Sequence, residues 1–241
     1  MSGKIILEGK DLVKSFGGRH AVDHVDFHLN DGEILGLIGP NGAGKTTLFN
    51  LISGALTIDS GLITLFGQKI SGKKPYTICR MGIARTFQAA KNFPGMSVYE
   101  NLLISAQFGQ KNVGASAAKT ITDEIIEFTA LESFIGKNIK DMPLAGQKRL
   151  EVARALATKP KILLIDEVMA GLNPSEVDEA IGLVRKINDS GITVIMIEHV
   201  MKAIMSVCGR IMVLHHGQNL AEGTPEEVSS NAGVIEVYLG G

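Results

Sequence analysis

Residues 34–47 read Ile-Leu-Gly-Leu-Ile-Gly-Pro-Asn-Gly-Ala-Gly-Lys-Thr-Thr, and this stretch decides how the chain folds. The apolar run 34–38 predicts a strand, and a G-x-x-x-x-G-K-T loop follows it directly. Apolar residues at helical spacing behind the loop predict a helix; they are Leu48, Phe49, Leu51 and Ile52. Glycines let backbone N–H groups turn inward around a phosphate chain, and the positive end of the helix faces the same place. The expected phosphate-binding residues are Gly39, Pro40, Asn41, Gly42, Ala43, Gly44, Lys45, Thr46 and Thr47.

Two side chains of this loop extend the prediction. Lys45 can reach the β- and γ-phosphates of a nucleotide, and the Thr46 hydroxyl can bind Mg²⁺. The alternative is a glycine-rich turn that contains a lysine by chance. The succession of strand, loop and helix favours the phosphate site, because the motif requires that context.

The composition is that of an ordinary globular protein, since 45% of the 241 residues are hydrophobic and 20% are charged. A net charge of −1 lacks the basic surplus of nucleic-acid-binding proteins, so we expect no nucleic acid partner. Cys79 and Cys208 lie in unrelated segments without metal-ligand spacing, which suits a reducing compartment and two small apolar side chains. The start does not resemble a signal peptide, and no apolar run approaches about 18 residues. We therefore expect a soluble protein that reaches a membrane only through a partner.

Apolar alternation predicts antiparallel strands within residues 4–30 and alternating strands and helices further on. The later expected strands are 61–67, 83–87, 161–166, 192–197 and 210–214, and the expected helices are 97–108, 117–130, 146–158, 175–189 and 200–207. Continuous apolar runs at 162–165 and 192–197 are typical of strands buried on both faces of a parallel sheet. The sequence predicts an α/β fold with N-terminal antiparallel strands and a helical segment inserted into the core.

One apolar strand ends in two acidic residues, Asp166 and Glu167. Because Mg²⁺ needs oxygen ligands, we expect the Asp166 carboxylate to bind this ion, directly or through water. Glu167 is then placed to orient or deprotonate an attacking water. The alternative is a pair of solvated loop residues, which the upstream phosphate loop disfavours.

Three further residues are weaker candidates. His199 follows a predicted parallel strand, and such strands present their carboxyl ends at one edge of a sheet, so His199 can face the γ-phosphate. Gln88 ends another strand, and its amide can contact Mg²⁺ or the attacking water. Phe16, before the turn at Gly17 and Gly18, can stack on an adenine ring or belong to the core, and the sequence leaves both interpretations open.

Taken together, these residues resemble the ATPase subunit of ATP-binding-cassette (ABC) transporters, and the resemblance covers essentially the whole chain. They occur in the family's order, namely Phe16, the loop 39–47, the Q-loop Gln88, a signature segment, Asp166 and Glu167, the D-loop 170–173 and the switch His199. The resemblance implies ATP and Mg²⁺ as cofactors. It also implies that Glu167, His199 and Gln88 are catalytic, and that Thr46, Gln88 and Asp166 hold the metal.

The resemblance further implies a P-loop NTPase-type α/β fold with a mixed, largely parallel sheet. A single ABC ATPase domain would cover residues 1–241. Its nucleotide-binding core would comprise 1–88 and 159–241, and its helical insert would run from about 89 to 158 and contain the signature segment.

The signature segment departs from the family pattern, Leu-Ser-Gly-Gly-Gln, which in the family contacts the γ-phosphate bound by the other subunit. Here residues 141–149 read Asp-Met-Pro-Leu-Ala-Gly-Gln-Lys-Arg. An ungapped alignment places the signature on 142–146, with Pro143 at the serine position. The alternative matches Gly146-Gln147, but it deletes one residue and turns the following helix by about 100°. The ungapped alignment is favoured by a coherent apolar stripe, formed by Leu150, Ala153, Leu156 and Ala157.

The ungapped alignment leaves the segment without its serine hydroxyl. Pro143 is tolerated in a first helical turn, where its missing N–H has no partner. Backbone N–H groups of Leu144, Ala145 and Gly146 can still meet the phosphate at the helix N terminus. We expect reduced but not absent support for hydrolysis from this segment.

Within the family, the chain most resembles the ATPases of branched-chain amino acid importers. This rests on residues 86–88, 92–98, 100–102 and 170–174 and on the C-terminal stretch 222–240. A sister group that powers lipopolysaccharide export is the nearest alternative. Less favoured are an ABC ATPase that works on nucleic acid or ribosomes, and a nucleotide-dependent interaction module without turnover.

The family resemblance also implies partners. Two such subunits, identical or paralogous, would pack head to tail and sandwich ATP between the phosphate loop of one and the signature of the other. Residues of the helical insert, about 88–102, would transmit movement to transmembrane permease subunits. The chain would be cytoplasmic and peripheral on the inner face of the cell membrane. Other subunits recognise the transported compound, so the sequence of this chain does not identify it.

Overall fold

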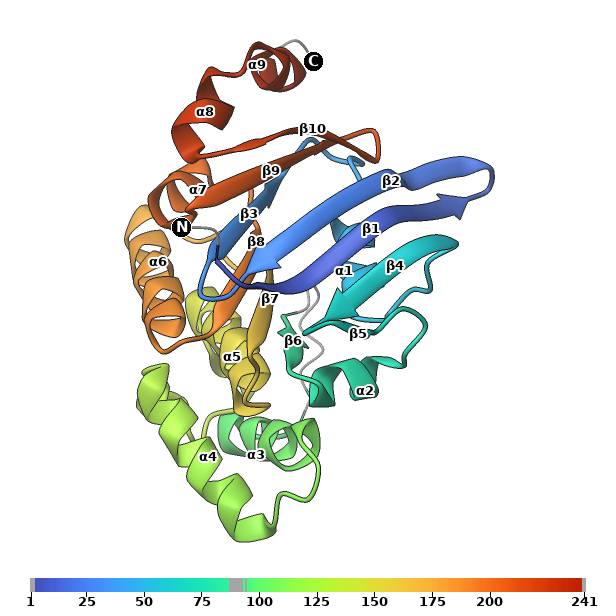
Figure 1. The fold of residues 1–241 in the computed structure, drawn as a ribbon. Helices are drawn as coiled ribbons and strands as arrows, with labels where there is room; N and C mark the ends of the chain where they lie inside the picture. Colours follow the sequence, from blue (N-terminus) through green and yellow to red (C-terminus); the bar gives the residue numbers. More distant parts are fainter. Residues whose placement is uncertain (1–2, 87–92, 94, 240–241) are drawn as a thin grey trace. The chain divides into compact units, whose positions relative to one another are not determined.

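The computed structural model describes residues 3–86, 93 and 95–239, so Gln88 lies outside the described residues. The chain divides into two compact units (Figure 1). The first unit comprises residues 1–78 and 193–241, and the second comprises residues 79–192. The second unit is therefore continuous in sequence and separates the two parts of the first. The predicted division into a core and an insert at residues 88 and 159 stays a prediction.

The N-terminal part of the first unit is an antiparallel sheet with the strand order β2-β1-β4-β5. Its strands are β1 (Ile5–Phe16), β2 (Arg19–Asn30), β4 (Ser60–Leu65) and β5 (Gln68–Lys69). Gly17 and Gly18 form the turn between β1 and β2 at φ values of 55° and 81°, which glycine adopts without a steric penalty. The predicted antiparallel strands at the N terminus are confirmed.

The same unit holds four neighbouring strands in the order β10-β9-β3-β8. They are β3 (Ile34–Ile38), β8 (Thr193–Ile197), β9 (Arg210–His215) and β10 (Gln218–Gly223). β3 is parallel to both of its neighbours, and β10 is antiparallel to β9. Every residue of β3 and β8 is buried, as expected for strands covered on both faces. Helices of this unit include α1 (Lys45–Ile52), α7 (Met201–Val207), α8 (Pro225–Ser230) and α9 (Ala232–Leu239).

The second unit combines parallel strands with a cluster of helices. β6 (Ile83–Arg85) runs parallel to β7 (Ile162–Asp166). The helices are α3 (Val98–Gly109), α4 (Ala115–Phe128), α5 (Leu144–Ala157) and α6 (Pro174–Asp189), with short 3-10 turns at Glu132–Phe134 and Ile139–Asp141. α3 packs against both α4 and α5, so the predicted helical stretch forms a cluster of its own. α2 (Pro75–Arg80) contains the boundary between the two units.

The predicted α/β fold with parallel strands and a helical segment is confirmed. Several boundaries shift by one or two residues; the helix expected over 146–158 begins at Leu144, and the one expected over 117–130 begins at Ala115. The sequence pattern missed α2, β10, α8 and α9, each of which is no longer than 8 residues. α8 does have a local signal, a capping box in which Thr224 and Glu227 satisfy each other's backbone N–H groups.

The two cysteines are free thiols. Cys208 is buried, and burial raises the pKa of its thiol to about 12, so it stays protonated at neutral pH. Burial also raises the pKa of the half-buried Cys79. Both side chains therefore behave as the small apolar groups expected from the sequence.

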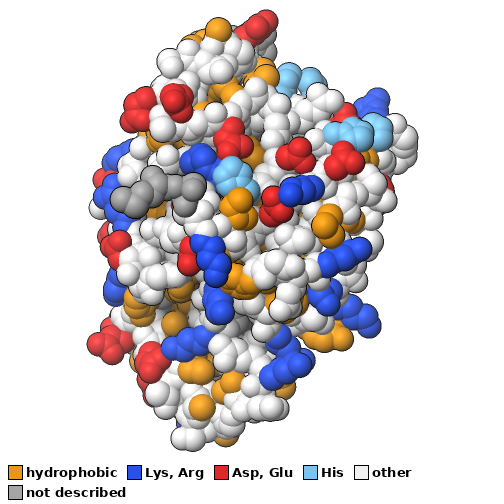
Figure 2. Space-filling model, viewed as in Figure 1, with side chains coloured by type: hydrophobic (Ala, Val, Ile, Leu, Met, Phe, Trp, Pro, Cys, Tyr) orange, Lys and Arg blue, Asp and Glu red, His pale blue; other side chains and the backbone are white. Residues whose placement is uncertain are grey.

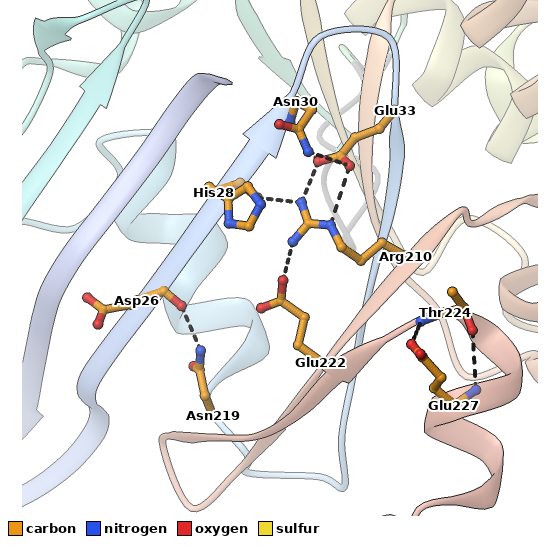
Figure 3. A network of polar contacts seen from close by, with 9 residues as sticks. All are labelled: Asp26, His28, Asn30, Glu33, Arg210, Asn219, Glu222, Thr224 and Glu227. Carbon is orange, nitrogen blue, oxygen red and sulfur yellow. Dashed lines mark hydrogen bonds and ion pairs between the residues drawn. The ribbon is translucent and has the colours of Figure 1, made fainter. Parts of the chain in front are cut away.

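A guanidinium in the first unit links strands of its two sheets (Figure 3). Arg210 on β9 donates through Nη2 to the Glu33 carboxylate (2.5 Å) and to the His28 carbonyl oxygen on β2 (2.8 Å). Its Nη1 pairs with Glu222 on β10. Burial lowers the pKa of Arg210, but the hydrogen bonds to Glu33 and Glu222 outweigh it, so the net pKa is raised. The group stays charged and holds β2, β9 and β10 together.

We expect Arg210→Met to lower the free energy of unfolding by about 2 kcal/mol, because it leaves Glu33 and Glu222 without their shared partner. Chemical denaturation of the purified chain measures this change. Lys69→Met, at an exposed position of β5, is the control and should change stability by less than about 0.5 kcal/mol. An equal effect of the two substitutions would contradict the role of the network.

Candidate functional site

The loop between β3 and α1 requires glycine at both of its ends. Gly39 and Gly44 have φ values of 149° and 102°. A Cβ at Gly39 would lie 2.1 Å from the Leu214 carbonyl oxygen, and one at Gly44 would lie 2.2 Å from the Ala21 carbonyl oxygen. Strands β9 and β2 therefore press against the loop and fix its backbone.

Lys45 begins α1 and turns back into the loop. Its Nζ donates to the carbonyl oxygens of Gly39 (2.6 Å) and Pro40 (3.0 Å), and the side chain is buried. The N-cap residue of α1 is Gly44, which has no side chain to cap the helix, so the first N–H groups of α1 can donate to an anion. Thr46 is exposed. The loop thus combines an ammonium group, N–H donors and a hydroxyl, which suits a phosphate chain with a hard cation.

His199 emerges at the same edge of the first unit as the phosphate loop. β8 pairs in parallel with β3, with Ile197 opposite Leu37, so the residues that follow the two strands leave at one edge. Glu198 is buried, whereas His199 is exposed. The predicted parallel pairing is confirmed, and the imidazole is accessible from solvent. Its contact with a γ-phosphate stays a prediction.

Phe16 ends β1 directly before the turn at Gly17 and Gly18, and its residue surface is 50% exposed. The interpretation of this ring as a core aromatic is therefore wrong. The Lys14 Nζ lies 5.5 Å from the ring centroid. β2, the partner strand in the same hairpin, borders the phosphate loop at Ala21. The exposure of the Phe16 ring is consistent with stacking on an adenine ring, which stays a prediction.

Asp166 ends β7 in the second unit and is fully buried. Its Oδ2 accepts a hydrogen bond from Arg85 Nη2 (2.7 Å), and its backbone N–H donates to Thr86 Oγ1 (2.8 Å). Among the described residues, its Oδ1 has no hydrogen-bond partner. A buried carboxylate oxygen of this kind suits a water molecule or a cation.

Mg²⁺ binding would depend on the nucleotide. In the part of the chain that the structure describes, no three His, Cys, Asp or Glu side chains are grouped to hold a metal. Mg²⁺ commonly binds through one or two carboxylates together with substrate phosphates and water. The Asp166 carboxylate and the exposed Thr46 hydroxyl have the right donor chemistry, while Gln88 lies outside the described residues.

Glu167 differs from Asp166 in exposure and in backbone conformation. It is only partly buried, and its φ of 50° lies in the left-handed region that residues other than glycine rarely adopt. Strained residues of this kind cluster at functional sites. Lys148 Nζ donates to the Glu167 carbonyl oxygen (3.4 Å) and so joins α5 to the strained residue.

The signature segment lies at the start of α5. Pro143 is the N-cap residue, one position before the first helical turn in which the sequence analysis placed it, and its side chain makes no capping hydrogen bond. The first three N–H groups of α5, those of Leu144, Ala145 and Gly146, therefore have no acceptor within the helix. The apolar stripe of the ungapped alignment is buried, namely Leu150, Ala153, Leu156 and Ala157. Contact of these N–H groups with a phosphate stays a prediction.

The sequence analysis missed three residues beside the candidate groups. Arg85 and Thr86, at the end of β6, contact Asp166, which lies 81 and 80 positions further along the sequence. The only local signal in the sequence is that both residues precede Gln88. Tyr238 on α9 lies close to Gly39, since burial raises the pKa of this phenol and the Gly39 N–H lowers it in part. No sequence pattern pairs α9 with the phosphate loop.

Comparison with known protein families gives two matches. The family described as ABC transporter matches residues 22–170, which include the phosphate loop, the signature segment and both acids. The chain belongs to the ABC transporter family. The family described as branched-chain amino acid ATP-binding cassette transporter matches residues 218–241 of this ABC ATPase.

Relatives of this ABC ATPase are similar along nearly their full length. The high-affinity branched-chain amino acid transport ATP-binding protein BraF of Pseudomonas aeruginosa is 39% identical over 250 residues, covering 98% of each chain. The lipopolysaccharide export system ATP-binding protein LptB of Escherichia coli is 35% identical over 234 residues, covering 97% of each chain.

Solved structures of cassettes share the fold. A nucleotide-free ATP-binding cassette from an ABC transporter has a TM-score of 0.89 at 31% identity, covering 98% of this chain and 100% of that one. The ADP conformation of the cassette MJ1267 has a TM-score of 0.88 at 32% identity, covering 98% and 99%. The predicted P-loop NTPase-type fold and the ATPase class are thereby confirmed.

The surface of the ABC ATPase carries charges of both signs. On the face shown in Figure 2, basic and acidic side chains are interspersed, in line with the net charge of −1. Within the described ranges, we find no helix with the length and apolar character of a membrane span.

Gly44→Ala should weaken ATP binding by about tenfold or more. The added Cβ would clash with the Ala21 carbonyl oxygen, and the loop must shift to relieve the clash, which costs more than roughly 1.4 kcal/mol of binding free energy. Gly42→Ala is the matched control. Its φ is also positive (80°), but a Cβ there meets nothing within 4 Å, so only the backbone cost of about 1 kcal/mol applies. Titration with a fluorescent ATP analogue measures both affinities. Equal losses would show that close approach does not shape the loop.

Proposed function

We propose that this ABC ATPase powers the import of branched-chain or related amino acids. The observation that carries the proposal is the match of residues 218–241 to the family of branched-chain amino acid cassettes. The similarity to BraF, a high-affinity branched-chain amino acid transport ATP-binding protein, supports it, at 39% identity over 98% of each chain. The matched segment contains β10, α8 and α9.

The second candidate function is lipopolysaccharide export. LptB is 35% identical over 97% of each chain, which is 4 percentage points below the 39% of BraF. So small a difference does not separate the two functions by itself. The C-terminal family match is therefore the observation that favours the importer.

The proposed binding step places the phosphates of ATP in the loop 39–47. Lys45 already lies inside the loop, so it exchanges the carbonyl oxygens of Gly39 and Pro40 for phosphate oxygens and neutralises their charge. The N–H groups at the start of α1 donate to the same phosphate chain. The exposed ring of Phe16 would stack on the adenine.

In the proposed hydrolytic step, a water molecule attacks the γ-phosphate and ADP leaves. Glu167 orients or deprotonates this water, and its partial exposure gives the carboxylate access to solvent. His199 and Gln88 would hold the γ-phosphate and the water in line for attack. Mg²⁺ bound by Thr46, Asp166 and Gln88 would neutralise charge that develops on the phosphate oxygens.

The proposed partner is a second ABC ATPase subunit, identical or paralogous, in a head-to-tail dimer. The N–H groups of Leu144, Ala145 and Gly146 would then donate to the γ-phosphate of the partner's nucleotide, and Leu144 is exposed at the start of α5. Transmembrane permease subunits would receive the movement through the helical insert. Binding to them would hold the ATPase at the inner face of the cell membrane.

Reconstitution with its permease subunits in proteoliposomes tests this function. We expect ATP-dependent uptake of leucine, isoleucine or valine, coupled to phosphate release. Lipopolysaccharide extraction without amino acid uptake would instead establish the second candidate. If no phosphate is released with either the amino acid permease or the lipopolysaccharide export system, only nucleotide binding is left. That result would contradict both transport proposals.

Glu167→Gln is the matched variant for the same assay, because it keeps the shape of the side chain and removes its charge. Turnover should fall by about a hundredfold or more while ATP stays bound, since the general base is lost. Light scattering should then detect an ATP-dependent dimer. Wild-type turnover in this variant would refute the role of Glu167.

Pro143→Ser should leave ATPase activity equal or higher by up to about tenfold, because serine restores a capping hydroxyl and a charge-assisted donor for phosphate. Steady-state phosphate release with the reconstituted transporter measures the effect. Pro225→Ser, at the start of α8 outside the signature, is the control and should leave turnover unchanged. A large loss confined to Pro143→Ser would contradict the ungapped alignment.

A further inference from the structure

A buried ion pair joins Arg85 to Asp166 within the second unit. The two side chains are 6% and 0% exposed, and Nη2 lies 2.7 Å from Oδ2. Burying two charges costs several kcal/mol each, and their attraction offsets this only where the geometry is good. Apolar residues of similar volume would often stabilise such a site equally well. Stability alone therefore does not account for this ion pair, and its role is sought in the function of Asp166.

The end of β6 fixes both the position and the rotation of the Asp166 carboxylate. The Thr86 N–H donates to the Leu164 carbonyl oxygen (2.9 Å), and Thr86 Oγ1 accepts the Asp166 N–H (2.8 Å). These two bonds hold the backbone at the end of β7. Arg85 then takes Oδ2, which sets the rotation of the carboxylate. Within the described part of the chain, Oδ1 is left without a hydrogen-bond partner.

Occupation of Oδ2 limits how Asp166 can bind a cation. A carboxylate binds a cation through one oxygen or through both. Ca²⁺ accepts six to eight oxygen ligands and commonly takes both carboxylate oxygens, whereas Mg²⁺ keeps a tight octahedron of single oxygens and water. With Arg85 on Oδ2, Asp166 offers Oδ1 alone, to an ion or to a water that the ion holds.

We propose that Arg85 is a positioning residue that makes Asp166 a one-oxygen ligand and so favours Mg²⁺ over Ca²⁺ as the ion bound with ATP. The inference rests on the proposed role of Asp166 in metal binding. In this proposal Arg85 influences the bound ion through the Asp166 carboxylate. Its place on β6, one residue before Thr86, lets a single strand end control both the backbone and the side chain of Asp166.

Equilibrium binding of ATP to the full chain in Mg²⁺, in Ca²⁺ and in EDTA tests the proposal. Arg85→Gln shortens the side chain, frees Oδ2 and should reduce the preference for Mg²⁺ over Ca²⁺ by about tenfold, the size usual for losing a group that orients a metal ligand. ATP affinity in EDTA should stay unchanged. Arg85→Lys keeps a cationic donor and should retain most of the preference.

Asp166→Asn separates this inference from the function on which it rests. It should weaken ATP binding in both ions, and an unchanged metal dependence would refute the role of Asp166 itself. If Asp166→Asn responds while Arg85→Gln keeps the wild-type preference, only the inference about Arg85 is overturned. Thermal unfolding of each variant completes the test, because a merely structural role would lower stability without altering the preference between ions.

The wild-type chain gives an independent check should Arg85→Gln fail to fold. A one-oxygen ligand should make its preference for Mg²⁺ exceed the preference that free ATP has in solution. No excess over free ATP would overturn the proposal without any variant.

Discussion

The close approach of two carbonyl oxygens to the phosphate loop is the constraint on which the nucleotide chemistry depends. Leu214 on β9 faces Gly39, and Ala21 on β2 faces Gly44, at distances that exclude any Cβ. These strands belong to different sheets, and the guanidinium of Arg210 links them. The conformation of a short loop is therefore a property of the whole first unit. The surrounding sheets fix the backbone of the loop. They thereby fix the positions of Lys45 and of the first N–H groups of α1, which are the expected phosphate-binding groups.

Local and periodic signals explain what the sequence could predict. The succession of strand, loop and helix at 34–52 and the continuous apolar run of β8 report on neighbouring residues, and the predicted elements are confirmed. The pairing of Arg85 with Asp166 joins residues 81 positions apart, and nothing in the tripeptide before Gln88 distinguishes a buried arginine from a surface one. Tyr238 was missed for the same reason, since contact with Gly39 depends on how α9 packs.

Adjacent acids in the sequence acquire different physical characters in the fold. Asp166 is the last residue of a buried strand, so its charge must be matched by protein, and Arg85 does so. One step further, the chain leaves the strand through a left-handed residue, and Glu167 reaches a partly exposed position. A pattern of two acids after an apolar run cannot separate these environments. The proposed division of labour, with Asp166 as metal ligand and Glu167 as base, would follow from a single change of backbone direction.

The close approach of Gly39 and Leu214 joins two segments that the ribosome makes at different times. The glycine is synthesised early, whereas β9, the strand that presses on it, follows the whole second unit in the sequence. The second unit is continuous in sequence, but β3 pairs with β8 and β9, which the ribosome makes after that unit. The fixed conformation of the phosphate loop therefore depends on a strand that is made long after the loop itself.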